Sequence, residues 1–460
     1  MTILANLVTP QLEKIHSGKV RESFRVDPAH RLIVATDRIS SFDNVLKTPV
    51  PGKGAVLNSL AAFWFGKTKE IIDNHFVKLV DPNISLVREA KPIKVEMIVR
   101  GYLTGSAWRG YEKGKRVFSG VTIPDGMSKN QPFEQPIVTP TTKEESDREI
   151  SPKELVEEGW VSAELYEQME AASLKLFAFG AQFLKERGII LVDTKFEFGL
   201  IGGKLVLIDE IFTPDSSRFW AVEDYEKDPL KVEQMDKEFV RAYLLKHKKD
   251  GRYPDVLPKE IIEETTRRYR DIYQRITGET LPDPEEDVLH RVYLNLLKHK
   301  LIKPGFVAFV MGSPSDLEHA QKMQKVVEDY GIYTELRVLS AHKNGERIPE
   351  LMATYNLSVE PGAIIAIAGR SNGLGGALAA NATIPVINCP PFKDKTDMMV
   401  NLNSSLMMPS NTPASTVVDP KNAALAALRS LNLPALRERF QKEIDQMKED
   451  LRHADEQLRR

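Results

Sequence analysis

The alternation of apolar and charged residues is clearest in the stretch from Ile189 to Trp220. Two apolar-rich runs flank a Gly-Gly pair there, which predicts a β-hairpin. In the first run Asp193, Lys195 and Glu197 alternate with apolar side chains. Because successive side chains of a strand point to opposite faces, the three charged groups are expected on one face of the hairpin.

The length of the hairpin loop decides whether a second carboxylate, Asp209, joins Glu197. A two-residue loop pairs Glu197 with Ile208 and turns Asp209 away, whereas a three-residue loop, Gly202–Lys204, places the two carboxylates opposite each other. Carboxylates about 5 Å apart repel unless a cation lies between them, and oxygen-only ligands suit Mg²⁺. We predict the three-residue loop and a Mg²⁺ site at Glu197 and Asp209. From spacing alone, a solvated strand face is the stronger alternative.

The segments before this hairpin carry weaker patterns. Period-two runs predict another hairpin within residues 14–50, and helical stripes predict helices over 54–74 and 162–187. A strand is predicted over 93–106. Residues 119–151 are rich in Pro, Ser, Thr and charge, so we expect a long irregular flap or mobile loop there.

Beyond residue 304 the pattern becomes strand and helix in alternation. This alternation predicts a parallel, doubly wound sheet of flavodoxin type, which binds ligands at the carboxyl ends of its strands. The expected strands are 306–311, 334–339, 363–368 and 386–388, and the expected helices are 317–330, 345–355 and 374–382.

Three polar clusters fall at that edge of the predicted sheet: Ser313–Asp316, Ser340–Lys343 and Gly369–Gly373. Within the second cluster, His342 is the natural proton carrier because imidazole titrates near neutral pH. A buried, hydrogen-bonded structural histidine is the alternative interpretation of His342. Three clusters on one edge favour a site.

Length and charge bound the rest. A chain of 460 residues predicts at least two domains, which we place at 1–281 and 305–460 with a linker and short helix over 282–304. A formal net charge of −2 gives no electrostatic reason to expect nucleic acid or an anionic membrane as partner. The single cysteine, Cys389, excludes an internal disulfide and fits a reducing compartment. With no leader pattern and no apolar run of membrane-spanning length, we expect a cytoplasmic protein.

The N-terminal part of the chain contains, in this order, SGKVRESF, VATDRISSFD, VEMIVRGYLTGSAW, TPTTK, DTKFEFG and DEIFTPDSSRFW. Their order and spacing over about residues 10–280 resemble the SAICAR synthetase family. These ATP-dependent ligases join aspartate to carboxyaminoimidazole ribonucleotide (CAIR) in purine synthesis. The resemblance implies a two-lobed α+β fold with a kinase-like ATP site, ATP and Mg²⁺ as cofactors, and CAIR and L-aspartate as substrates.

The same resemblance implies residue roles. For ATP these are Lys19, Arg21, Glu96 and Asp209; for CAIR and aspartate, Asp37, Ser40, Arg100, Ser106 and Arg218; for catalysis, Asp193 and Lys195; and for Mg²⁺, Glu197 and Asp209.

In the C-terminal part, GSPSD, SAHK and AGRSNGLG resemble AIR carboxylase over about residues 305–430. They are similar to the form that adds CO₂ directly to aminoimidazole ribonucleotide (AIR), because the mutase form has HR in place of HK and a GAGGAAH-like loop in place of GRSNGLG. The resemblance implies catalysis by His342 and Lys343. For AIR and CO₂ it implies Ser313, Ser315, Asp316, Ser340, Gly369, Arg370, Ser371, Asn372 and Gly373.

The last predicted helix, Pro434–Arg460, carries an apolar stripe that fits either its own domain or a neighbouring subunit. The resemblance to AIR carboxylases favours the neighbouring subunit and implies a homo-octamer. The whole chain is thus expected to make CAIR from AIR and CO₂ and then SAICAR from CAIR and aspartate. Two alternatives keep the ligase but make the C-terminal half a non-catalytic ribonucleotide-binding or assembly module, or an N5-CAIR mutase.

Overall fold

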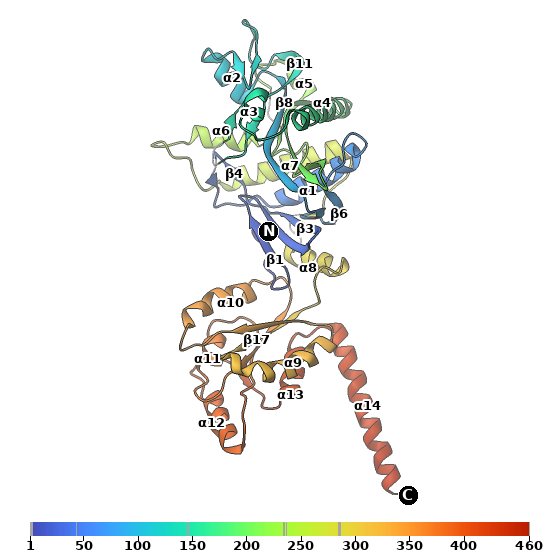
Figure 1. The fold of residues 1–460 in the computed structure, drawn as a ribbon, viewed down its shortest axis with the longest axis vertical. Helices are drawn as coiled ribbons and strands as arrows, with labels where there is room; N and C mark the ends of the chain where they lie inside the picture. Colours follow the sequence, from blue (N-terminus) through green and yellow to red (C-terminus); the bar gives the residue numbers. More distant parts are fainter. Residues whose placement is uncertain are drawn as a thin grey trace. The chain divides into compact units, whose positions relative to one another are not determined.

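The computed structural model describes residues 3–42, 44–144, 147–232, 235, 237–283 and 287–459. They form two compact units, each with its own apolar core (Figure 1). The first unit takes Lys14–Val292 with the residues up to Asn6, and the second takes Leu7–Glu13 with the residues from Tyr293 onward. A short segment near the start of the chain is therefore part of the C-terminal unit.

The first unit contains a five-stranded sheet with the strand order β1-β2-β3-β7-β6. The hairpin predicted within residues 14–50 is confirmed by the antiparallel pairing of β2 with β3. Helix α1 packs on this sheet and ends earlier than predicted. The elements are β1 (Glu13–Ser17), β2 (Arg21–Asp27), β3 (His30–Ala35), α1 (Lys53–Thr68), β6 (Phe76–Asp81) and β7 (Ile84–Arg88).

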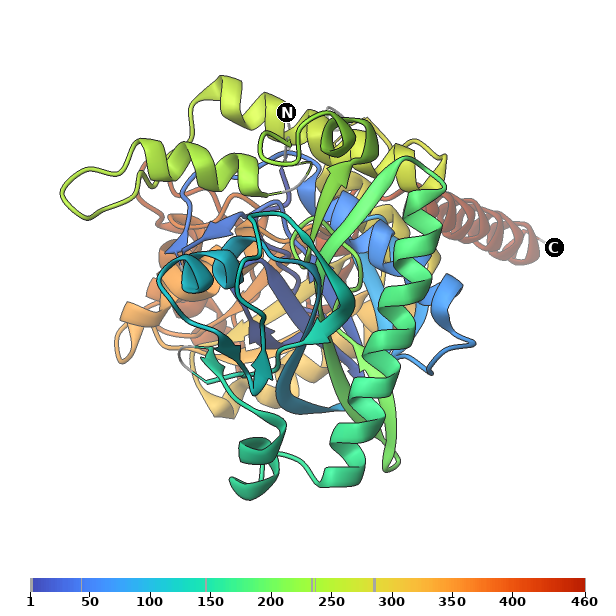
Figure 2. The same cartoon turned by 90° about the horizontal axis from the view of Figure 1, so that it is seen from above.

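A larger, seven-stranded sheet carries the predicted charged hairpin. Its order is β13-β12-β8-β14-β15, with β11 also paired to β8 and β16 to β14. Helix α4 runs along this sheet (Figure 2). The elements are β8 (Lys91–Tyr102), β11 (Pro132–Val138), β12 (Thr141–Thr142), β13 (Arg148–Glu149), α4 (Ala163–Lys185), β14 (Ile189–Ile201), β15 (Lys204–Ile208) and β16 (Ser217–Ala221).

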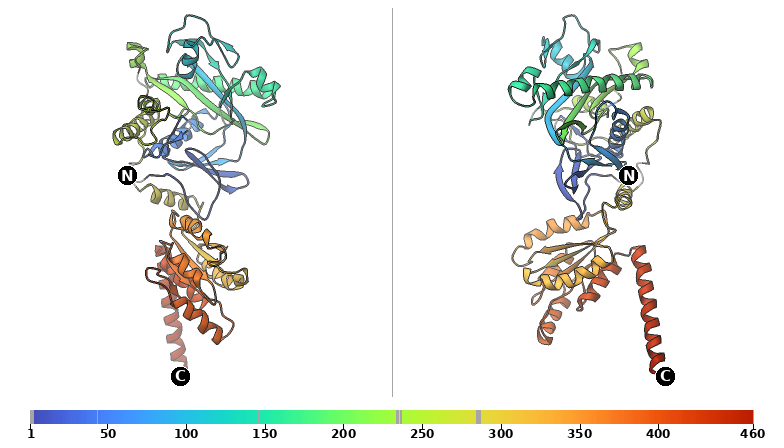
Figure 3. Two further views of the ribbon diagram at one scale, coloured as in Figure 1. Left: turned by 90° about the vertical axis from the view of Figure 1, so that its left-hand side faces the viewer. Right: turned by 45° about the vertical axis from the view of Figure 1, so that its right-hand side comes forward.

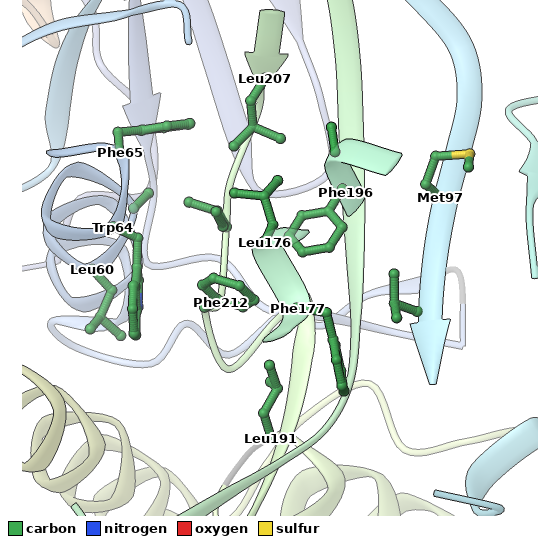
Figure 4. Packing of buried hydrophobic residues seen from close by; sticks show 14 of the residues in the cluster. Leu60, Trp64, Phe65, Met97, Leu176, Phe177, Leu191, Phe196, Leu207 and Phe212 are labelled. Atoms are coloured by element: carbon green, nitrogen blue, oxygen red, sulfur yellow. The ribbon is translucent and has the colours of Figure 1, made fainter. Parts of the chain in front are cut away.

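The core of the first unit lies behind β14, against α1 and α4 (Figure 4). Phe196 is fully buried and meets Phe212 edge to face at 5.5 Å, and Phe212 meets Trp64 of α1 at 4.9 Å. Because Phe196 alternates with Lys195 and Glu197 along the strand, its burial directs the charged side chains to the opposite face.

The predicted three-residue hairpin loop is wrong. Glu197 pairs with Ile208 and Ile201 with Lys204, which leaves Gly202 and Gly203 as a two-residue loop. Both glycines have positive φ, +57° and +80°, the conformation of the tight turn that matches the right-handed twist of paired strands. The requirement of strand twist, rather than a requirement to pair carboxylates, sets this turn.

The prediction of an irregular flap over residues 119–151 is wrong where three strands form, over 132–138, 141–142 and 148–149. Strands β11 and β12 pair with β8, and β13 pairs with β12. These strands are short or half exposed and lie at the edge of the sheet, so their sequence lacks the apolar alternation that identifies a strand.

The predicted linker helix is present as α8 (Val288–Lys298), and the division between the two units falls within it. Residues 284–286 of the predicted linker lie outside the described residues.

The second unit is a five-stranded parallel sheet in the order β18-β17-β19-β20-β21, which is the flavodoxin order 2-1-3-4-5. Alternate residues of β17 face opposite cores, Phe309 towards α9 and α13 and Val310 towards α10 and α11. The predicted three-layer α/β architecture is confirmed. The elements are β17 (Phe306–Met311), α9 (Leu317–Asp329), β18 (Tyr333–Val338), α10 (Ile348–Asn356), β19 (Gly362–Ile367), α11 (Gly373–Ala379), β20 (Val386–Asn388), β21 (Ser415–Thr416) and α13 (Pro420–Ser430).

Two long helices complete this unit. Helix α12 (Lys395–Leu406), which the sequence did not predict, follows β20, and α14 (Pro434–Leu458) matches the predicted last helix. Only Leu436 and Phe440 of α14 are buried, and its distal half extends away from the sheet (Figure 3). Within the described part of the chain, no helix combines the length and apolar character needed to span a membrane.

Candidate active sites

Strand β14 lies at the centre of the first site because it pairs with β8 on one side and with β15 and β16 on the other. Asp193 is in register with Arg100 of β8 and Arg218 of β16. Arg218 donates to Asp193 Oδ2 at 2.5 Å, and Arg100 donates to the same oxygen at 3.4 Å. Thr139, in the TPTTK motif, accepts from Arg100 Nε at 2.9 Å and fixes that guanidinium.

Two residues further along β14, Lys195 lies between two carboxylates. Its Nζ contacts Glu96 Oε1 at 2.7 Å and Glu197 Oε1 at 3.2 Å. Glu197 is in register with Glu96, so the two carboxylates are neighbours across β14 and β8. Lys143 of the TPTTK motif contacts Glu197 as well, and lies 3.8 Å from Glu96.

Asp209 comes directly after β15 and has a positive φ of 66°. The strand alternation therefore does not apply to Asp209. Arg21 of β2 pairs with Asp209 and, at 2.5 Å, with Glu210. Arg21 thus connects the five-stranded sheet to the end of the charged hairpin.

The pKa values show that Glu197 and Asp209 act on each other despite the two-residue loop. Burial and the charge of Asp209 raise the pKa of Glu197 to about 7, against the effect of Lys195 and Lys143. Burial opposes ionisation of Asp209 too, but Arg21 and the two lysines hold the pKa of Asp209 well below its ordinary value. The electrostatic proximity that we predicted is present, although the predicted register that was to produce it is not.

The donor set around Glu197 and Asp209 fits Mg²⁺. Four carboxylates (Glu96, Glu197, Asp209 and Glu210) meet three cations (Arg21, Lys143 and Lys195), which leaves an excess negative charge. In the described ranges no cluster of three or more His, Cys, Asp or Glu side chains converges as a complete metal shell. Mg²⁺ usually takes only one or two protein carboxylates and completes its shell with water and substrate phosphates, so two carboxylates suffice.

A cavity of about 670 Å³ opens beside Arg218. Its lining contains three cations (Arg109, Lys129 and Arg218) and one carboxylate (Glu112), so the charged groups of the pocket are mainly basic. Such a basic pocket next to Asp193 has the size and charge for a phosphorylated or carboxylated small molecule.

The other residues predicted for this unit are dispersed. Lys19 is exposed on the turn between β1 and β2, and Ser106 is exposed in the first turn of α2 (Gly105–Glu112). Ser40 is half-buried in β4 (Ser40–Ser41). Asp37 is buried, and its two oxygens accept the backbone N–H groups of Leu4 and Gly54 at 3.0 Å each. Asp37 therefore connects backbone segments here.

The second site is a cavity of about 1140 Å³ at the carboxyl edge of the parallel sheet. It gathers nine predicted residues: Ser313, Ser315, Asp316, Ser340, His342, Lys343, Gly369, Arg370 and Ser371. Ser313 accepts from Ser315 N at 3.3 Å and from Ser315 Oγ at 2.8 Å, which shapes the turn before α9. His342 is exposed in this cavity, so the alternative of a buried structural histidine does not describe it.

Asn372 and Gly373 are placed differently from the other predicted residues. Asn372 is buried, and its side chain caps α11 by accepting from Gly375 N at 3.1 Å. Gly373 packs against the imidazole, since a Cβ on Gly373 would lie 2.9 Å from His342 Cε1. These two residues support the wall of the cavity.

Several lining residues were missed by the sequence reasoning. The cavity is closed on one side by the segment after β20 and by α12, which contribute Pro391, Phe392, Lys393, Asp394, Asp397 and Asn401. The rule that ligands bind at the carboxyl ends of parallel strands applies to β20 as it does to its neighbours, so the position of Pro391 after that strand was the available signal. In the first unit, Lys143 was within a recognised motif but had no role assigned.

Comparison with known proteins gives matches to both units. The family model of SAICAR synthetase matches residues 14–256, and that of AIR carboxylase matches residues 306–453. A phosphoribosylaminoimidazole-succinocarboxamide synthase of Legionella pneumophila (strain Paris) is 42% identical over 300 residues, covering 61% of this chain and 94% of that protein. The protein of the same name from Bacteroides fragilis (strain YCH46) is 40% identical over 299 residues, covering 63% and 95%. The solved SAICAR synthase of Saccharomyces cerevisiae complexed with SAICAR is 34% identical, with a TM-score of 0.53, covering 62% of this chain and 99% of that one.

Proposed function

Because this chain belongs to the SAICAR synthetase family and carries an AIR carboxylase domain behind it, we propose that it performs two consecutive steps of purine biosynthesis. The second unit carboxylates AIR with CO₂ to give CAIR. The first unit then joins CAIR to L-aspartate with hydrolysis of ATP to give SAICAR. The observation that carries the ligase assignment is the alternating arrangement of Asp193, Lys195 and Glu197 along β14. Arg218 of β16 binds Asp193, Glu96 of β8 binds Lys195, and Lys143, directly after β12, binds Glu197.

In the ligase unit we assign different functions to the charged residues on and around β14. Arg218, Arg100 and the cations of the adjoining cavity bind the phosphate and carboxylate of CAIR. Guanidinium groups form strong charge-assisted hydrogen bonds with both of these anions. The SAICAR bound to the yeast relative supports this choice of ligand. Lys195 and Arg21 bind the ATP phosphates and stabilise negative charge on the phosphoryl group in transfer. Lys19, exposed just before β2, is assigned to the same phosphates from the family resemblance alone.

Glu197 and Asp209 would hold Mg²⁺, with Glu96 and Glu210 beside them. When bound, this ion would supply the positive charge that draws electron density from the transferred phosphoryl group.

Amide formation also requires a neutral amine. The carboxylate of CAIR is first activated by phosphorylation, and the aspartate amine then forms the C–N bond as phosphate leaves. Asp193 lies beside the proposed CAIR pocket, and we assign to it the removal of the amine proton.

In the carboxylase unit, Ser313, Ser315 and Asp316 bind the ribonucleotide at the turn before α9, where backbone N–H groups favour phosphate. C4 of the imidazole attacks CO₂, a C–C bond forms, and the proton on C4 has to leave. His342 takes that proton, and Lys343 with the Gly369–Gly373 loop stabilises the new carboxylate.

The proposal includes a homo-octamer built through the carboxylase unit. Helix α14 supports an association of this kind, because Met447, Leu451 and Leu458 on its distal half expose 55%, 66% and 89% of their surface. Apolar side chains at this spacing on a projecting helix are suited to packing against another subunit.

One assay tests the carboxylase assignment against its alternatives. Purified protein is supplied with AIR and bicarbonate in the absence of ATP, and CAIR is measured. A direct carboxylase forms CAIR under these conditions. A non-catalytic module forms none from any substrate, and a mutase forms CAIR only when N5-carboxylated AIR is supplied.

A further inference from the structure

Helix α12 holds the Gly369–Gly373 loop of the carboxylase cavity by side-chain contacts to its backbone. Ser404 Oγ accepts the N–H of Asn372 at 2.5 Å, and Asn401 Oδ1 accepts the N–H of Arg370 at 2.5 Å. A third hydrogen bond joins Asn372 Nδ2 to Ser405 Oγ at 2.9 Å. Three polar side chains on one face of this helix thus fix three groups of one loop.

The loop needs an external support of this kind. Arg370 has a positive φ of 57°, a conformation that a residue with a side chain rarely adopts unless its surroundings impose it. The hydrogen bond that its N–H donates to Asn401 Oδ1 supplies that constraint. Asn401 is 2% exposed, and its Nδ2 donates to Pro391 O at 2.7 Å. One buried amide therefore ties together the two loops that follow β19 and β20.

The loop transmits its position to His342. Gly373 lies beside the imidazole, close enough that a Cβ would come within 2.9 Å of Cε1. Any shift of the loop backbone therefore moves the wall on which the ring rests. By contrast, Ser313, Ser315 and Asp316 approach the cavity from the turn before α9 and do not depend on α12.

We propose that Asn401, Ser404 and Ser405 of α12 are positioning residues of the carboxylase site, which hold the Gly369–Gly373 loop against His342 in the geometry for proton removal. This inference rests on the carboxylation proposed above. Because the clamp acts on the loop beside the proton carrier and not on the turn that binds nucleotide, its loss lowers kcat and changes the KM for AIR little.

The test uses the full-length protein and three substitutions on α12. Ser404→Ala removes the acceptor for Asn372 N–H, Ser404→Thr restores a hydroxyl, and Asn403→Ala changes an exposed residue of the same helix that faces away from the loop contacts. We expect Ser404→Ala to lower kcat for carboxylation about tenfold, with KM for AIR within about twofold. Ser404→Thr should recover most of the loss, and Asn403→Ala should match the unchanged protein.

Two readouts on the same samples separate positioning from a loss of folded protein. SAICAR formation from added CAIR reports on the first unit, and thermal melting reports on the second, and both should be unchanged in Ser404→Ala. An unchanged kcat in Ser404→Ala overturns the proposal, as does a fall in activity that Ser404→Thr does not recover or that follows a lowered melting temperature. If the unchanged protein makes no CAIR from AIR and CO₂, the carboxylase assignment fails first, and the same comparison is made with N5-carboxylated AIR.

Discussion

The guanidinium of Arg218 lies directly against the α-carbon of Gly105. A Cβ at position 105 would come within 2.3 Å of Arg218 Nη1, and Gly105 also has a positive φ of 57°. Arg218 lines the cavity, and this close approach to Gly105 allows its guanidinium to donate to Asp193 Oδ2 at 2.5 Å. The position of Arg218 therefore requires that residue 105 has no side chain.

Gly105→Ala is expected to lower kcat/KM for SAICAR formation about 10²-fold, because a displacement of Arg218 by even about 1 Å would disturb its contact with Asp193 and the CAIR binding that we propose for it. Gly114→Ala is the matched control, since Gly114 has a positive φ of 93° but no atom within 4 Å of the added Cβ. Steady-state kinetics of both variants check this. Equal losses in the two would show that backbone strain, and not the contact with Arg218, is responsible.

Asp209→Asn is expected to lower the rate of SAICAR formation by about 10²-fold or more and to leave carboxylation intact. The change removes a charge that pairs with Arg21 and acts on Lys195 and Glu197. Both activities are measured on one preparation, so the carboxylase rate is the folding control. Loss of both activities would point to misfolding and would contradict the assignment.

The ligase should require more Mg²⁺ as the pH falls below about 7. Burial and Asp209 raise the pKa of Glu197 to about 7, so a proton competes with the metal for this carboxylate in the range below that value. The Mg²⁺ concentration for half-maximal SAICAR formation should rise by up to about tenfold per pH unit, and saturating Mg²⁺ should shift the acid limb to lower pH. A Mg²⁺ requirement that is the same at pH 6 and pH 8 would remove Glu197 from the metal site.

The same pKa predicts the direction of a stability change in the metal-free protein. A carboxyl whose folded-state pKa is raised favours the protonated folded form, so its contribution to stability is lost as the pH rises from about 4.5 to about 7. Melting of the first unit, followed with chelator present, should show this decline, and added Mg²⁺ should reduce it.

His342→Ala should lower carboxylation by about 10²–10⁴-fold and leave SAICAR formation from added CAIR unchanged. His342 is exposed in the cavity, so its removal is not expected to disturb the core. His453→Ala, on the exposed distal part of α14, is the control for loss of a surface histidine. Near-normal carboxylation by His342→Ala would exclude it as proton carrier.

The segment Leu7–Glu13 should stabilise the second unit. Thr9 Oγ1 and Gln11 Nε2 donate to the buried Glu360 Oε1 at 2.7 and 3.1 Å, and Gln11 exchanges two further hydrogen bonds with the backbone of Lys303. Thr9→Val leaves Glu360 with one donor fewer and should lower the free energy of unfolding of this unit by about 1–3 kcal/mol. Denaturant unfolding followed by carboxylase activity checks this; an unchanged midpoint would contradict it.

The sequence predicted those parts of the structure that follow from a repeating pattern of apolar and polar residues. The period of two placed Asp193, Lys195 and Glu197 on one face, because the other face of that strand is buried. The strand–helix alternation predicted the parallel sheet, because helices cover both faces of such a sheet and its strands are therefore apolar throughout. Asp209 could not be placed in this way, because its position depends on a positive φ after the strand has ended. The period of a strand carries no information about that conformation.

Helix α12 was missed for a different reason. Its sequence, KTDMMVNLNSSL, has apolar residues on more than one side, and its buried positions are the polar Asn401 and Ser405. Pattern recognition identifies a helix by an apolar stripe, whereas α12 packs by hydrogen bonds to a loop. The functional role of such residues becomes visible only when their partners are known.

The location of residues 7–13 in the second unit has a consequence for biosynthesis of the protein. Thr9 precedes its partner Glu360 by 351 positions, so this segment leaves the ribosome long before the residues that bind it have been synthesised. The ligase half can complete its core during translation, while the early segment stays unpaired until the last third has been made. A gene divided at the boundary between the two activities would deliver that segment on the wrong product, and the carboxylase made alone would lack a piece of its own surface.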